Sequence, residues 1–418
     1  MSERSGEQDS SSVTLPLAGL RIIEISTYVA GPSGAMALAQ LGADVIRVDP
    51  IGGATDIRRL PLDAEGHSLY WAGLNKAKRS VEIDLRRDEG RELVLRLLSV
   101  EGGEGGILLT NAVGQSWLDY ELLSTRCPNL IAVHIAGRNN GKPAVDYTVN
   151  CEVGLPFLTG PADFARPVNH VLPAWDLLTG LYAALGVLAA VRSRKQSGKG
   201  SYVAISLADV ALATMGHLGF IADVVVNANA RPRDGNYLYG TFGCDFSTAD
   251  GHEVMIVALT ESHWRNLVEL TGIGRAIAAL ERALGIDLSA EDERYRQREV
   301  IVGLMRPWFT SRSFDQVVAA LERSRVLWGP YRSVEELVRN PDSLLRESDL
   351  MAEVAHPDIG SFPIPRSVLG FESVLHAAPR RAPLLGEHTE EVLSSLLDLD
   401  QGDLEHLRAA GLIGATHK

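Results

Sequence analysis

The fold of this chain is decided by the stretch LRIIEISTYVAGPSGAMALAQLGADVIRVD, which runs from Leu20 to Asp49. Two short apolar runs within it, LRIIEIS (Leu20–Ser26) and DVIRVD (Asp44–Asp49), flank a segment from Ser33 to Leu41 that is typical of a helix. Strands that are almost continuously apolar and alternate with helices are typical of a parallel sheet covered on both faces. The stretch therefore predicts a strand–helix–strand unit of an α/β fold.

The same alternation continues through the first half of the chain. An amphipathic helix is expected at Arg87–Ser99, and a further helix is expected at Ala208–Val226. Further strands are predicted at Arg79–Leu85, Gly106–Asn111, Leu130–Ala136 and Ser201–Leu207. The fold class is therefore α/β, with a Rossmann-like parallel sheet.

The character of the sequence changes near Asn227, where a hairpin with Asp250-Gly251 at its tight turn is followed by short helices. We assign residues 14–226 to a large α/β domain and residues 227–366 to a smaller α+β domain. Residues 367–418 are helical and are expected to return to the large domain. The polar, Ser-rich residues 1–13 are read as a disordered tail without the apolar core of a signal peptide.

Composition limits the cellular compartments and the classes of ligand that suit this chain. The chain has 418 residues and a formal net charge of −13, which argues against a general binder of nucleic acid or of membrane surfaces. Its three cysteines show neither a disulfide framework nor the spacing of a metal site. We expect a cytoplasmic protein without a bound metal, in which any anionic ligand is held by a local basic cluster.

The strongest functional signal is VLPAWDLLTGLYAALGVLAAV, Val171 to Val191, in which Asp176 is the single charged residue. Pro173 suits the first position of a helix, so Asp176 falls in the opening turn, where the helix dipole favours an anion. A carboxylate kept ionised in a partly dry pocket is a usable nucleophile. We take Asp176 as the catalytic residue.

Two other interpretations of this run compete with that one. The run is long enough to cross a bilayer, but its Pro, Asp and two Gly residues and the ordinary soluble sequence after it disfavour a membrane span. An acidic residue in a first turn can also serve only as a helix cap, and on residue type alone a cap is the better interpretation. The rest of the chain reverses that preference.

Familiar catalytic motifs are missing from the sequence. The first strand is followed by STYVAGPSG instead of a dinucleotide fingerprint, and neither a G-x-S-x-G elbow nor an H-E-x-x-H pair occurs. What remains is a set of basic residues at strand ends, which suits a ligand with several phosphates. They are Arg58, Arg59, Lys76, Lys78, Arg79 and Arg138.

The chain resembles the class III CoA-transferases along nearly its whole length. Five blocks occur in the family's order, from LAGLRIIEIS and VAGPSGAMALAQLGADVIRVD near the amino terminus, through LNKAKRSVEIDLR, LPAWDLLTGLYAALGVLAAV and GNYLYGTFGCDFSTADG, to PLLGEHTEEVL. The blocks DPIGGATDIRR, YWAGLNKAKRS, GRNNGKPAVDYTVN, VNHVLPAWD and RPRDGNYLYG are most similar to members that move CoA between the two carboxyl groups of mesaconate. The resemblance implies an interlocked homodimer whose large domain is completed by the carboxyl terminus, and a CoA ester of a small dicarboxylic acid as substrate.

The resemblance also implies which residues form the site. Asp176 takes the position of the family's catalytic aspartate, and the backbone at Val29-Ala30 matches the loop over the CoA. The CoA tail would be lined by Leu74, Asn75, Lys76, Ala77, Asn111, Ala112, Val113 and Arg138. Position 29 is Val where formyl-CoA transferases have Gln, and Pro50 replaces an Arg that holds the nucleotide, so Arg47, Arg58 or Arg59 would substitute.

The expected chemistry is transfer of an acyl group through Asp176, by way of mixed anhydrides and an aspartyl-CoA thioester, with CoA as part of the substrate and no tightly bound cofactor. Three alternatives stay open. The first is an intermolecular CoA-transferase with two substrates, and the second is a non-catalytic CoA-binding protein. The third, a racemase, is disfavoured because the residue before Asp146 is Val145 and not the His that such members carry.

Overall fold

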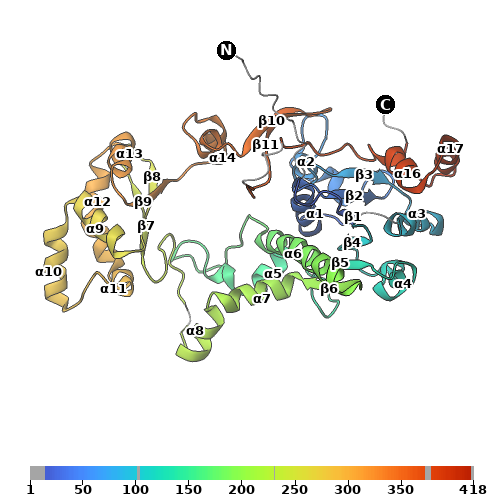
Figure 1. Cartoon of the computed structure of the whole chain (residues 1–418). Coiled ribbons are helices and arrows are strands. Elements are labelled where there is room, and N and C mark those ends of the chain that lie inside the picture. Colours follow the sequence, from blue (N-terminus) through green and yellow to red (C-terminus); the bar gives the residue numbers. More distant parts are fainter. Residues whose placement is uncertain (1–14, 101–103, 230, 372–377, 416–418) are drawn as a thin grey trace, which may run out of the picture. The chain divides into compact units, whose positions relative to one another are not determined.

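The computed structural model describes residues 15–100, 104–229, 231–371 and 378–415, so the expected tail at residues 1–13 lies outside the described residues. The chain divides into two compact units (Figure 1). The first unit, called unit 1, comprises Met1–Val153, Val171–Ile221 and Ser348–Lys418. The second, called unit 2, comprises Gly154–His170 and Ala222–Glu347.

Unit 1 is built on a six-stranded sheet in the order β3-β2-β1-β4-β5-β6, in which every neighbouring pair is parallel. The strands are β1 (Arg21–Ile25), β2 (Asp44–Asp49), β3 (Arg79–Glu82), β4 (Ile107–Thr110), β5 (Ile131–Ala136) and β6 (Ser201–Ser206). The predicted parallel α/β sheet is confirmed. The strand order reverses direction between β1 and β4, and in such sheets ligands bind beyond the carboxyl ends of the strands on either side of that point.

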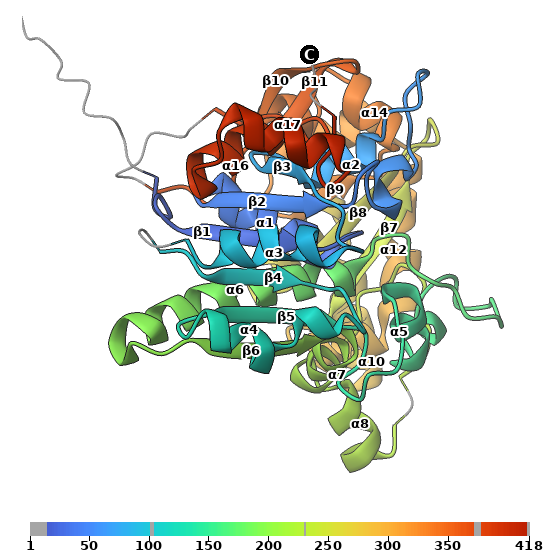
Figure 2. The same cartoon turned by 90° about the vertical axis from the view of Figure 1, so that its right-hand side faces the viewer.

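Helices cover both faces of this sheet (Figure 2). One face packs against α3 (Asp88–Leu98), α4 (Tyr120–Arg126), α16 (Thr389–Leu397) and α17 (Gln401–Ala409), and it forms a continuous apolar core with them. The other face carries α1 (Ala30–Gln40) and the long α6 (Ala174–Ser197). Shorter helices, α2 (Leu69–Leu74), α5 (Asp146–Glu152) and α7 (Leu207–His217), lie near the ends of the strands.

Helix α6 is long and apolar enough to span a membrane by length and composition alone. In the structure it lies against α1, β5 and β6, and eight of its residues are buried. Pro173 occupies the cap position just before the helix instead of its first turn, and Gly198 ends the helix in the left-handed region with φ = 72°. The helix is therefore a core element of unit 1.

Unit 2 contains a three-stranded antiparallel sheet, β7 (Phe242–Ser247), β8 (Glu253–Ala258) and β9 (Leu327–Pro330). The predicted hairpin is present, with Gly251 at φ = 82° in its turn. Helices pack on this sheet around an apolar core of their own. They are α9 (Glu261–Thr271), α10 (Gly274–Leu284), α11 (Glu291–Arg296), α12 (Arg298–Thr310) and α13 (Phe314–Glu322). Two short helices, α14 (Val334–Arg339) and α15 (Leu344–Glu347), follow in the chain and have no buried residue.

The structure divides the chain at other places than the sequence suggested. The segment 154–170 belongs to unit 2, because Arg233 donates to the carbonyl oxygens of Pro156 and Phe157 at 3.0 and 3.2 Å. The hairpin of β10 (Met351–His356) and β11 (Gly360–Pro365) belongs to unit 1, where Gln40 Nε2 donates to the Pro365 carbonyl at 3.1 Å. Both ties join residues far apart in sequence.

One predicted helix is broken in the structure. The helix expected over Ala208–Val226 is two helices, α7 and α8 (Phe220–Asn227), bent by 57°. The break falls at Gly219, whose φ of 79° interrupts the helical path. The apolar residues continue across the break, which is why periodicity alone did not reveal it.

Candidate active site

Asp176 lies in the first turn of α6, as predicted, and its carboxylate does not cap the helix. The cap comes from α5: Asp146 Oδ2 accepts the backbone N–H of Trp175 at 2.7 Å and that of Asp176 at 3.0 Å. Asp146 is 1% exposed. Among the described residues no hydrogen bond to the Asp176 carboxylate is found. A half-buried carboxylate without a structural partner is free to react.

Burial and, to a smaller extent, the nearby charge of Asp146 raise the pKa of Asp176 to about 7, against the opposing effect of the positive charge of Arg59. This corrects the expectation of a carboxylate that is fully ionised at neutral pH. The helix dipole favours the anion, but desolvation and a like charge outweigh it. Once ionised, a carboxyl group with a raised pKa is a more basic nucleophile than an ordinary aspartate.

Two glycines bring α6 against the beginning of α1. A Cβ on Gly180 would lie 2.7 Å from the Ala30 carbonyl oxygen, and one on Gly34 would lie 2.4 Å from the Gly180 carbonyl oxygen. The first turn of α6, with Asp176, therefore begins beside the first turn of α1, where Val29 and Ala30 lie. N–H groups in the first turn of a helix have no acceptor within the helix, so this backbone can stabilise negative charge next to Asp176.

Arg59, Tyr28 and Tyr70 form a cluster next to Asp176. The Arg59 guanidinium lies over the ring of Tyr28 at 5.2 Å and over the ring of Tyr70 at 4.9 Å, measured to the ring centroids. Burial raises the pKa of Tyr70, the charge of Arg59 opposes the shift, and the charge of Asp176 adds to it. From the sequence, Arg59 was a candidate only for binding the adenosine phosphates, and no signal pointed to Tyr70.

Several predicted basic residues are used inside the fold. Arg47 is fully buried and forms ion pairs with Asp49 at 2.8 Å and with Asp56 at 3.1 Å. Lys78 is paired with Glu24 at 2.7 Å, and burial lowers the pKa of Lys78 to about 8. We call these five residues the buried charge network. Arg47 and Lys78 are therefore not available for phosphate groups, because their partners already compensate their charge.

The segment Leu74–Ala77 is held inside unit 1. Asn75 is 1% exposed. Its side-chain oxygen accepts hydrogen bonds from Arg47 and Lys78, and its side-chain nitrogen donates one to the Trp71 carbonyl. Lys76 is also buried, and burial lowers its pKa to about 8. Leu74 ends α2, and the Ala77 N–H donates to the Arg381 carbonyl at 3.1 Å. The structure brings the four predicted residues together, but it assigns Asn75 a structural role.

The remaining predicted CoA contacts follow β4 and β5. Asn111 and Thr27 exchange two hydrogen bonds, at 3.0 and 2.8 Å, which join the ends of β4 and β1. The Ala112 N–H donates to Thr110 Oγ1, Val113 is 60% exposed, and Arg138 is paired with Glu152 of α5. These residues lie at the carboxyl edge of the sheet.

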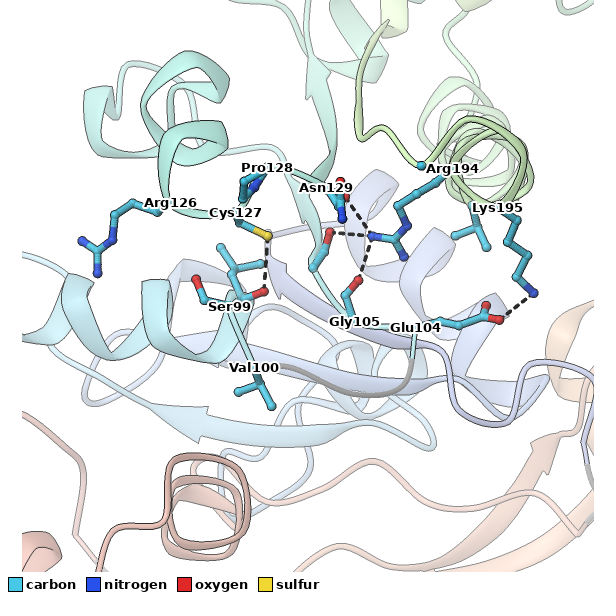
Figure 3. A pocket seen from close by; sticks show the side chains of 14 residues that line it. Ser99, Val100, Glu104, Gly105, Arg126, Cys127, Pro128, Asn129, Arg194 and Lys195 are labelled. Atoms are coloured by element: carbon cyan, nitrogen blue, oxygen red, sulfur yellow. Dashed lines mark hydrogen bonds and ion pairs between the residues drawn. The ribbon is translucent and has the colours of Figure 1, made fainter.

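Two cavities in unit 1 were compared as ligand sites. One of about 280 Å³ is lined by Arg58, His67, Trp71 and His356. The buried atoms Trp71 Nε1 and His356 Nε2 have no hydrogen-bond partner among the described residues. A second cavity, of about 470 Å³, lies where β4 and β5 begin, opposite the carboxyl edge (Figure 3). There Arg194 donates to three backbone carbonyls, so its charge already serves the fold.

Within the parts of the chain that the structure describes, no cluster of three His, Cys, Asp or Glu side chains that could hold a metal ion is found. The three thiols, Cys127, Cys151 and Cys244, are free. Asp146 is the residue that a closer sequence analysis could have found, because it is an acidic residue at the start of a short helix preceding the Asp176 segment.

Comparison with known proteins gives four findings. A family model described as CoA-transferase family III matches residues 17–389. The chain is 47% identical over 403 residues to a 2-methylfumaryl-CoA isomerase of Chloroflexus aurantiacus, covering 96% of this chain and 98% of that protein. It is 30% identical to a succinyl-CoA:mesaconate CoA-transferase of Haloarcula marismortui, covering 90% and 95%. The crystal structure of a CAIB/BAIF family protein from Brucella suis matches with a TM-score of 0.74 and 26% identity, covering 92% of this chain and 100% of that one.

Proposed function

Because the chain belongs to CoA-transferase family III, we propose that it moves CoA between the two carboxyl groups of mesaconate (2-methylfumarate) within one bound substrate. The single observation that carries the mechanism is the half-buried Asp176 carboxylate, which has no hydrogen-bond partner among the described residues and whose pKa is about 7. The 47% identity to a 2-methylfumaryl-CoA isomerase supports the choice of substrate.

The reaction begins with attack of the Asp176 carboxylate on the thioester carbonyl, which forms a mixed anhydride and releases CoA thiolate. The thiolate attacks the aspartyl carbonyl of the anhydride, giving an aspartyl-CoA thioester and free mesaconate. The second carboxylate of mesaconate attacks the aspartyl thioester, and the thiolate leaves again. The CoA thiolate then attacks the mesaconyl carbonyl of the new anhydride, so that the isomeric thioester forms and Asp176 is regenerated.

The surroundings of Asp176 suit these steps. Each attack places negative charge on a carbonyl oxygen, and the backbone N–H groups where α1 begins, near Val29 and Ala30, stabilise it. No separate general base is needed, because the carboxylate is the nucleophile once it is ionised. Water must be excluded while the anhydride exists, since an anhydride hydrolyses.

CoA needs a second anchor for its phosphates. Arg47 is compensated by Asp49 and Asp56, and Arg59 lies at the reacting end, where the pantetheine arm separates it from the nucleotide. Of the three arginines proposed to replace the family's nucleotide-binding Arg, only Arg58 therefore remains available. It lines the 280 Å³ cavity together with His67, Trp71 and His356, and its guanidinium can bond a phosphate group there. We place the nucleotide there.

We also propose a cytoplasmic homodimer, interlocked as the family resemblance implies. Apolar side chains on the outer faces of α6 and α7 are more than half exposed in the single chain, which is unusual for a solvated surface. They are Leu181, Leu185 and Leu212. A second copy of the chain would cover them. Sedimentation velocity on the full chain tests this proposal, and a monomer at micromolar concentration would contradict it.

The decisive experiment supplies mesaconyl-C1-CoA alone and follows the C4 ester by chromatography. Conversion without any added acid is expected. Isotope-labelled free mesaconate, added in excess, should not enter the product if the transfer is intramolecular. If conversion requires an added acid, the protein is an intermolecular CoA-transferase. Asp176→Ala should still bind CoA but lose turnover, and hydroxylamine should trap an aspartyl adduct only in the unsubstituted protein.

A further inference from the structure

The positive charge of Arg59 is not bonded to a carboxylate in the described parts of the chain. Its guanidinium contacts the faces of Tyr28 and Tyr70, and within the described parts of the chain no ion pair or hydrogen bond to a carboxylate engages it. Aromatic rings hold a guanidinium in place but leave its five N–H donors unused. The side chain therefore presents a free donor fork beside Asp176, and such a fork binds a carboxylate in two parallel hydrogen bonds.

The hydroxyl group of Tyr70 also lacks a bonding partner among the described residues. Tyr70 Oη is buried and has no hydrogen-bond partner among the residues that the structure describes. A buried hydroxyl that bonds nothing costs free energy, and proteins tolerate such groups where a ligand satisfies them. Burial raises the pKa of Tyr70, so the hydroxyl stays protonated and can donate at neutral pH.

The backbone around Arg59 is fixed, so this arrangement exists before a ligand arrives. Ser68 Oγ donates to the Arg59 carbonyl at 2.6 Å. The preceding residues are held by Asp56, which accepts the Tyr28 N–H at 3.1 Å and pairs with buried Arg47. The hydrogen bonds and the ion pair of Asp56 thus connect the segment before Arg59 to the buried charge network. A donor set that is already in position binds a carboxylate without losing much conformational entropy.

We propose that Arg59 and Tyr70 bind the carboxylate of the substrate that is not joined to CoA, and so select dicarboxylyl esters and retain the acid after CoA has left it. This inference rests on the proposed function and adds the residues that determine its specificity. Without such a cation, the doubly negative acid would leave the negatively charged site between the two half-reactions.

One anion site is sufficient for both halves of the reaction. The two carboxyl groups of a trans-butenedioate are related by an approximate two-fold axis, which only the methyl group breaks. When the free acid turns about that axis, the carboxylate that was bound to Arg59 faces Asp176, and the carboxylate released from CoA takes its place at Arg59. The same residues therefore serve the C1 and the C4 ester.

The test measures trapping of the aspartyl adduct by hydroxylamine with two esters, mesaconyl-C1-CoA and methacrylyl-CoA, which lacks the second carboxylate. The unsubstituted protein should prefer the dicarboxylyl ester. In Arg59→Gln and Tyr70→Phe the ratio of the two trapping rates should fall by roughly 10- to 100-fold, the range for one charge-assisted hydrogen bond. The ratio is the readout because loss of Arg59 also raises the pKa of Asp176 and slows the reaction with both esters. Arg59→Lys, which keeps the charge but not the fork, should recover part of the preference.

A second measurement follows retention of the acid. With labelled free mesaconate present, the product of the unsubstituted protein should stay unlabelled, whereas Arg59→Gln should incorporate label. If both variants keep the full preference and the product stays unlabelled, the inference is wrong although the proposed function stands. If the unsubstituted protein itself does not convert mesaconyl-C1-CoA alone, the proposed function fails first. Loss of folding in a variant would show in its circular dichroism, and Arg59→Lys then provides the comparison.

Discussion

Unit 1 holds two arginines in opposite ways, and the contrast separates what keeps the fold from what does chemistry. Arg47 is fully buried, and three carboxylates, Glu24, Asp49 and Asp56, act on it. The Arg59 guanidinium lies on the rings of Tyr28 and Tyr70 and forms no ion pair within the described parts of the chain. The Asp176 carboxylate and the Tyr70 hydroxyl beside it also have no hydrogen-bond partner there. Charges with a complete set of partners stabilise structure, whereas charges without one are available to a ligand.

Removal of the Asp176 carboxylate should give the largest effect. Asp176→Asn should lower kcat by at least about 10³-fold, because no other described side chain offers a free carboxylate at the beginning of α6. The same change should stabilise the protein at pH 8. A carboxyl group whose pKa is raised on folding favours the folded state below its unfolded pKa and loses that contribution as pH rises through about 7.

Urea unfolding at pH 5 and pH 8 measures this second effect. The variant should be more stable than the unsubstituted protein at pH 8, by at most about 4 kcal/mol, and the difference should shrink at pH 5. Solvent screening reduces the effect, since Asp176 is only half-buried. Equal stability at both pH values would mean that Asp176 is not desolvated in solution.

Substitution of each arginine by methionine tests the comparison directly. Arg47→Met leaves Asp49 and Asp56 buried without their cation, and removal of one partner from a buried pair typically costs about 3–5 kcal/mol. Arg59→Met removes only exposed contacts with aromatic rings and should cost less than about 1 kcal/mol. Thermal unfolding of the two variants gives both values. Similar losses would show that Arg59 also belongs to the structure.

The fold could be predicted from sequence because burial on both faces dictates its pattern. The strand at Asp44–Asp49 and the hairpin at Asp250-Gly251 were predicted within a residue or two, since apolar runs and turn residues are local signals. The sequence did not predict the hydrogen bond between Arg233 and Pro156, because it joins residues that are distant in sequence. It also did not predict the break in the helix at Gly219, because the apolar pattern continues across the break.

For the site, the sequence predicted the position of Asp176 in the first turn of a helix, which the structure confirms, but not the surroundings of Asp176. An acidic residue in an apolar helix start singles out Asp176, whereas nothing in the sequence distinguishes Arg59 from Arg47 or Lys78. Whether a basic residue binds phosphate or closes a buried ion pair depends on the carboxylates it meets, and these come from other strands. The pKa of Asp176 was misjudged for a similar reason, because the burial that raises it most and the Asp146 charge that adds to it both come from the folded surroundings.

Asp146→Asn should shift the pH dependence of the reaction by a smaller but specific amount. The asparagine oxygen can still accept the N–H groups of Trp175 and Asp176, so the cap is kept while the negative charge is lost. The pKa of Asp176 should then fall, because a like charge no longer opposes its ionisation. The acidic limb of kcat/KM should move to lower pH, by up to about one unit.

Glu121→Gln is the control for that experiment, since it removes a negative charge from the exposed face of α4 and should leave the pH profile unchanged. An unchanged profile in Asp146→Asn, with kcat/KM reduced at every pH, would mean that Asp146 acts on Asp176 only through the position of the helix. A profile shifted to higher pH would contradict the assigned sign of the interaction.

The smallest effect is expected at Arg58, which adjoins Arg59 in sequence but lines a separate cavity. If Arg58 holds the 3′-phosphate of CoA, Arg58→Gln should raise KM for the CoA ester by up to about tenfold with kcat unchanged, because the contact is the same in the ground and transition states. The increase should vanish with the 3′-dephospho-CoA ester, which cannot make that contact. Arg58→Gln should also keep the preference for dicarboxylyl esters that Arg59→Gln loses. Equal KM values for variant and unsubstituted protein with both esters would remove Arg58 from the nucleotide site, and then the charge of the CoA phosphates must be met elsewhere in the chain.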